Sequence, residues 1–100
     1  WLGIEVQDVT PELANSFRLD AARGALIAGV VRNGPAAKAG IRPGDILLSI
    51  EGKDVANSAQ MLNLIAALAP AQVAKMKVLR QGEEVQVEAM IGTRPKFTRR

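Results

Sequence analysis

The chain lacks both cysteine and histidine, and these two absences exclude several kinds of chemistry. Without them there is no ligand set typical of zinc, no cysteine nucleophile and no Ser-His-Asp triad. The acidic residues are scattered over turns and helix starts, so the sequence predicts no catalytic residue. No apolar run approaches the roughly 18 residues that a membrane-spanning helix needs. We therefore expect a non-enzymatic segment with no cofactor, no metal and no direct insertion into a membrane.

Aromatic residues are also scarce, and the basic residues are unevenly placed. One Trp, two Phe and no Tyr offer little surface for stacking on bases. The net charge is +3, but Arg94, Lys96, Arg99 and Arg100 all lie in the last seven residues. The rest of the chain is close to neutral, so we expect no binding of nucleic acid. We interpret residues 93–100 as a basic tail, a linker or a chain end.

What the chain does contain is enough apolar sequence for one small core. Its 100 residues are 48% hydrophobic and 23% charged, which is typical of a single globular domain. Because the first residue is not Met, we expect the chain to be part of a longer protein.

The order of apolar runs and turn residues predicts a mixed fold. Alternating or continuous apolar runs predict strands, over residues 3–9, 25–32, 45–50, 74–80 and 83–91, with a short extended piece after the turn at 51–53. The Thr10-Pro11 and Pro35 signals predict two short helices, and Asp45 is expected to cap the turn that Pro43 and Gly44 form. The last two strands are expected to form a hairpin at Gln81-Gly82.

A longer helix is expected after Asn57. Asn57 and Gln60 have the spacing of a capping box, and Pro70 is expected to end the helix. An apolar stripe follows at helical spacing, made of Met61, Leu62, Ile65 and Leu68. The fold class is therefore α+β: a small, partly open antiparallel β-barrel or sandwich of five to six strands, capped by one main helix and two short helices.

The opening residues WLGI run directly into the first strand. Gly3 can turn the backbone so that successive N–H groups point the same way, and such a nest of amides binds an anion. With a free strand edge and an apolar helix face beside it, the nest would form a groove for an extended peptide that ends in a carboxylate. The alternative is that Leu2 and Ile4 are ordinary core residues of a first strand.

Three segments carry a resemblance to a known family. They are WLGIEVQDVTPELA, GALIAGVVRNGPAAKAGIRPGDILLSIEGKDV and KVLRQGEEVQVEAMIG. In order and spacing they resemble the PDZ domain of the HtrA/Deg family of bacterial envelope serine proteases. The resemblance covers about residues 1–92, and the stretch GPAAKAGIRPGDILLSIEGKDV is its most specific part.

The resemblance implies a peptide-binding site. It assigns Trp1, Leu2, Gly3 and Ile4 to a loop that binds the peptide carboxylate. It assigns Ile4, Glu5 and Val6 to the strand that pairs with the peptide. It implies a hydrophobic pocket lined by Leu2, Ile4, Val6, Met61, Leu62 and Ile65. Asn57, Ser58 and Gln60 would lie where family members adjust their preference upstream of the last peptide residue.

The resemblance also implies a biological setting. Such a module captures the hydrophobic C-termini of unfolded or outer-membrane proteins in the periplasm. It then controls, or delivers substrate to, an attached trypsin-like serine protease domain that is not in this chain. Two alternatives remain at this point: a PDZ module of an intramembrane or tail-specific protease, or a scaffold that binds internal peptide segments.

Overall fold

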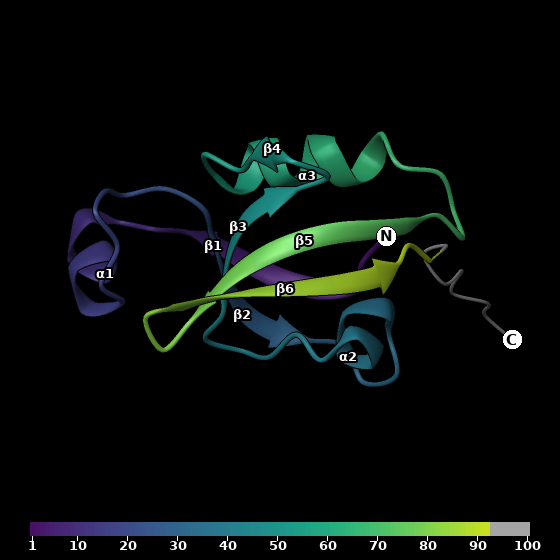
Figure 1. Ribbon diagram of the computed structural model, residues 1–100, viewed down its shortest axis with the longest axis horizontal. Helices are drawn as coiled ribbons and strands as arrows, with labels where there is room; N and C mark the ends of the chain where they lie inside the picture. Colours follow the sequence, from purple (N-terminus) through teal and green to yellow (C-terminus); the bar gives the residue numbers. More distant parts are fainter. Residues whose placement is uncertain (93–100) are drawn as a thin grey trace, which may run out of the picture.

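The computed structural model describes residues 1–92, and the segment that we interpret as a tail lies outside the described residues (Figure 1). Within these residues, six strands and three helices follow one another. The strands are β1 (Ile4–Asp8), β2 (Ala25–Val30), β3 (Ile46–Ile50), β4 (Lys53–Asp54), β5 (Val73–Arg80) and β6 (Glu83–Met90). The helices are α1 (Pro11–Ser16), α2 (Pro35–Ala39) and α3 (Ser58–Ala66). The α+β class expected from the sequence is confirmed.

The strands form one antiparallel sheet in the order β1-β2-β3-β5-β6, with β4 paired to β3. The sheet curls, and the segment after β6 approaches the segment before β1. There the Gly92 N–H donates a hydrogen bond to the Trp1 carbonyl at 3.0 Å. α3 lies along one side of the curled sheet, α2 lies on the other side beside β6, and α1 lies at one end (Figure 1). β1 remains an edge strand.

The β5–β6 hairpin forms as expected. Gln81 and Gly82 both have positive φ, 53° and 82°, the geometry of a two-residue turn that joins twisted strands. In β6 the predicted alternation is present, because Ala89 is buried and Val85 and Val87 are half-buried, whereas their neighbours in the strand are exposed.

Helix α3 begins as the sequence predicts but ends earlier. Asn57 Oδ1 accepts the Gln60 N–H at 2.8 Å, while Gln60 Oε1 accepts the N–H of Ala56 rather than that of Asn57. The last helical residue is Ala66, and a tight turn precedes Pro70. Pro70 therefore excludes further helix but does not mark its end.

An ion pair holds the end of the molecule opposite the WLGI loop. Asp45 is 2% exposed, and its carboxylate accepts two hydrogen bonds from Arg80, at 3.0 and 2.7 Å. It also accepts the Arg42 N–H at 3.0 Å, which confirms that Asp45 caps its turn. The pairing with Arg80, 35 residues away in the sequence, ties the end of β5 to the start of β3. A buried carboxylate is tolerated here because its charge is paired and hydrogen-bonded.

Candidate functional site

Within residues 1–92, the first strand leaves its outer peptide groups unpaired at Ile4. The Val31 N–H donates to the Gly3 carbonyl at 2.9 Å, next to the pair Ile4↔Val30. That bond identifies Ile4↔Val30 as a non-hydrogen-bonded pair, in which both residues turn their own N–H and C=O groups away from each other. The N–H and C=O of Ile4 therefore point away from β2, toward the open edge of the sheet.

The same holds two residues further along, at Val6. Its partner Ile27 donates to the Asp45 carbonyl and accepts from the Gly44 N–H, both at 2.8 Å, on the side away from β1. Ile27 has no peptide group left for β1, so the N–H and C=O of Val6 also face outward. β1 thus presents two sets of outward donors and acceptors, spaced as another strand would require.

The loop before β1 is held by its carbonyl groups. The carbonyl oxygens of Trp1, Leu2 and Gly3 accept hydrogen bonds of 2.9 to 3.0 Å from three separate segments of the domain. The donors are the N–H groups of Gly92, Ala36 and Val31. In a trans peptide the N–H points opposite to the C=O, so the amides of Leu2, Gly3 and Ile4 are turned away from the domain body. Among residues 1–92, no backbone acceptor takes the amide of Leu2 or Gly3. Three consecutive amides are therefore available to an anion.

Gly3 makes this loop geometry possible. Its φ of +78° lies in the left-handed region, which a residue with a Cβ rarely adopts. A Cβ at Gly3 would also lie 3.3 Å from the Trp1 ring, and one at Gly34 would lie 3.7 Å from the same atom. The Trp1 indole therefore packs against both glycines.

Helix α3 contacts β1 and exposes one large apolar side chain. Leu2, Met61 and Ile65 belong to the main core and are only 3%, 2% and 7% exposed. Ile4 and Val6 pack against that core but are half-buried, whereas Leu62 is 60% exposed. The predicted stripe therefore divides into core residues and a residue at the surface.

Asp8 joins β1 to the start of α3, which the sequence did not indicate. Its Oδ1 accepts the Ser58 N–H at 2.8 Å, across 50 residues. This hydrogen bond, together with the Ser58 hydroxyl, lowers the pKa of Asp8, so the exposed carboxylate is charged at neutral pH. The only signal in the sequence is the two-residue period, which puts Asp8 on the same face of β1 as Ile4 and Val6.

The structure thus brings the predicted loop and strand residues to one edge, with α3 beside it. Two surface hollows adjoin Phe17 and the β5–β6 turn, away from this edge. An unpaired strand edge that starts at three available amides is suited to bind a peptide with a free C-terminus as an added strand.

Comparison with known families agrees with this geometry. A family model described as PDZ domain matches residues 1–91, so the chain belongs to the PDZ domain family. It is a PDZ domain of the kind found in HtrA and DegP-like serine proteases, which confirms the resemblance seen in the sequence. No helix within residues 1–92 has the length and hydropathy to cross a membrane.

Two relatives and two solved structures illustrate the similarity. The chain is 43% identical over 95 residues to probable periplasmic serine endoproteases, DegP-like, from Hahella chejuensis and Ectopseudomonas mendocina. Each alignment spans 95% of this chain but only 20% of the relative's length. The chain therefore corresponds to the PDZ portion of those relatives. The HtrA-type protease AlgW with a decapeptide is 42% identical, with a TM-score of 0.85, over 96% of this chain and 30% of that one. The HtrA3 PDZ domain bound to a phage-derived ligand, 21% identical with a TM-score of 0.76 over 90% of this chain and 82% of that one, supports the fold alone.

Proposed function

We propose that this domain binds protein C-termini with a free carboxylate and an apolar last residue, as a strand added to β1. The observation that carries the proposal is the coincidence of two features. The amides of Leu2, Gly3 and Ile4 point outward at the start of β1, and the peptide groups of Ile4 and Val6 are unpaired along it. A carboxylate at the loop requires the ligand to run antiparallel to β1.

The pocket for the last ligand side chain lies between β1 and α3 in this proposal. Ile4, Val6 and the exposed Leu62 line it, and the buried Leu2, Met61 and Ile65 form its floor. Its apolar character selects an apolar last residue, because burial of each CH₂ group contributes about 0.8 kcal/mol.

In the whole protein, we propose, this module recruits substrates to an attached trypsin-like serine protease in the periplasm, or regulates that protease. Support comes from the relatives, which are named probable periplasmic serine endoproteases. Further support comes from AlgW, an HtrA-type protease 42% identical to this chain, whose solved structures include one with a decapeptide and one with a tripeptide. C-termini of unfolded or outer-membrane proteins fit the required ligand chemistry. Residues 1–92 would be the peptide-binding unit, and residues 93–100 a linker.

The test is a calorimetric titration of two peptides that differ only at the C-terminus. One carries a free carboxylate and the other an amide, and both end in the same apolar residue. Hydrogen bonds to a charged group contribute roughly 1.5 to 3 kcal/mol each, so the loss of one or two predicts about a 10- to 1,000-fold weaker affinity. Equal affinities would favour a scaffold that binds internal segments.

Gly3→Val provides a matched control on the protein side. A β-branched residue resists the φ of +78° that the loop requires. This variant should therefore bind the free-acid peptide more weakly, with an affinity close to that for the amidated peptide. Circular dichroism must show that the variant is folded. A folded variant that keeps the full preference for the carboxylate would contradict the proposed loop.

A further inference from the structure

Asp8 places a negative charge at the far end of the proposed binding edge. The side chains of Ile4, Val6 and Asp8 lie on one face of β1, because residues two apart in a strand share a face. The first two are apolar and half-buried, and the third is an exposed carboxylate whose Oδ1 is bonded to the Ser58 N–H. The edge is therefore apolar where the ligand would end and acidic upstream.

The register of an added strand fixes which ligand residue meets Asp8. In antiparallel pairing, directly opposed residues put their side chains on the same face of the sheet, and both strands repeat every two residues. If the last ligand residue lies beside Ile4, the residue two places earlier lies beside Val6. The residue four places before the last then lies beside Asp8.

The surroundings of Asp8 leave it able to take a cation. Helix α3 (Ser58–Ala66) contains no charged residue, so the helix side of the site supplies no competing cation. The Ser58 hydroxyl oxygen is buried, so on this side the exposed carboxylate of Asp8 is the group that a ligand can reach. A ligand ammonium or guanidinium group beside Asp8 would therefore pair with this exposed carboxylate.

We propose that Asp8 is a specificity-determining residue that selects ligands with Lys or Arg at the fourth residue before the last. This inference rests on the proposed function, since it assumes the register of a C-terminal peptide on β1. Asp8 and the cation form an exposed ion pair, so the selectivity is modest and falls as salt increases. It adds to the apolar selection at the last residue and does not replace it.

The test uses three free-acid peptides that differ only at that fourth position, which is Lys, Gln or Glu. At low salt the Lys peptide should bind about 3- to 10-fold more tightly than the Glu peptide, with the Gln peptide between them. In Asp8→Asn this ratio should fall to within about twofold, while the Gln peptide keeps its affinity. Asn is nearly isosteric and can still accept the Ser58 N–H, so thermal unfolding should show a folded variant.

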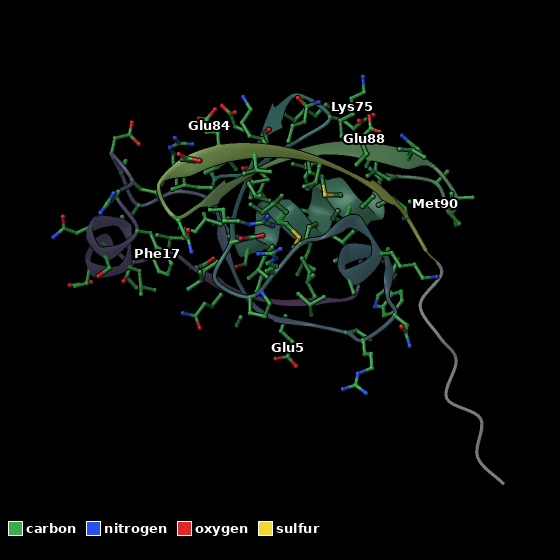
Figure 2. All side chains as sticks on the ribbon, turned by 60° about the horizontal axis from the view of Figure 1, so that its bottom comes forward. Glu5, Phe17, Lys75, Glu84, Glu88 and Met90 are labelled. Atoms are coloured by element: carbon green, nitrogen blue, oxygen red, sulfur yellow. The ribbon has the colours of Figure 1, made fainter. Side chains whose placement is uncertain are left out.

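Glu5→Gln is the matched control. It removes the same charge from the same strand, but the Glu5 side chain lies on the other face and points away from the domain (Figure 2). The Lys-to-Glu ratio should stay as in the wild type. A ratio near one in the wild type, an unchanged ratio in Asp8→Asn, or an equal loss in Glu5→Gln would each overturn the inference. If none of the three peptides binds, the proposed function itself fails, and this inference fails with it.

Discussion

β1 and β6 are the two edge strands of one sheet, and within residues 1–92 both have peptide groups that point outward without a partner strand. The side chains around these two edges differ. In β6 the two-residue turn makes Arg80↔Glu83 a hydrogen-bonded pair, so alternation turns the peptide groups of Glu84 and Gln86 outward. The exposed side chains Glu84, Glu88 and Lys75 stand on the outer side of this hairpin (Figure 2). Charged side chains on an edge strand oppose pairing with another chain.

β1 has unpaired peptide groups as well, but its surroundings differ. On the face toward α3 it carries the apolar Ile4 and Val6, and the loop before it offers three outward amides. A free edge alone therefore does not make a binding site. A binding edge also needs an apolar wall and a group that fixes the register of the incoming strand.

The largest effect should come from the wall that β1 has and β6 lacks. Ile65 is 7% exposed and belongs to the core, so Ile65→Ala should reduce the free energy of unfolding by about 2 to 5 kcal/mol. Leu62 is 60% exposed, so Leu62→Ala should change it by no more than about 0.5 kcal/mol. Denaturant titration measures both.

The same two variants divide structure from binding. Leu62→Ala should stay folded and still weaken the binding of the peptide several-fold, because it removes apolar surface from the rim of the proposed pocket. If Leu62→Ala binds the peptide as the wild type does, the exposed side of α3 does not form an apolar wall for the peptide. That proposed difference between β1 and β6 would then be wrong.

A proline exchange compares the two edges directly. The N–H of Val6 and that of Gln86 both point outward, and proline is tolerated on an edge strand where its missing N–H faces outward. Val6→Pro should keep the fold and lower the affinity for the peptide by about 10-fold, since one hydrogen bond to the ligand is lost. Val6→Ala keeps the N–H and separates this loss from that of the side chain.

Gln86→Pro should keep both the fold and the peptide affinity. If it weakens the peptide as much as Val6→Pro does, β6 takes part in binding, and the distinction between the edges is wrong.

Local signals in the sequence predicted most of the fold. Turn residues, caps and alternation placed every helix and strand to within a few residues, because each depends on neighbours in the chain. Pro70 misplaced the end of α3, since a proline forbids helix but does not oblige it to continue that far. The ties between Asp45 and Arg80 and between Asp8 and Ser58 were not predicted, because they join residues 35 and 50 positions apart.

The resemblance predicted which residues belong to the candidate site, but not which of their side chains are buried and which are exposed. The helical spacing grouped Met61, Leu62 and Ile65 into one stripe. Only the packing of α3 on the sheet decides that Met61 and Ile65 are buried while Leu62 is exposed. The stripe is wider than the buried face of the helix, and periodicity alone does not mark where the core stops.

We propose that β1, and not β6, accepts the ligand strand. Amide hydrogen exchange read by NMR, with and without a saturating free-acid peptide, tests it residue by residue. We expect the amides of Ile4 and Val6 to become protected by about 10-fold or more, and the amides of Glu84 and Gln86 to exchange as before. Protection on β6, or unchanged exchange at Ile4 and Val6 while the peptide is bound, would contradict it.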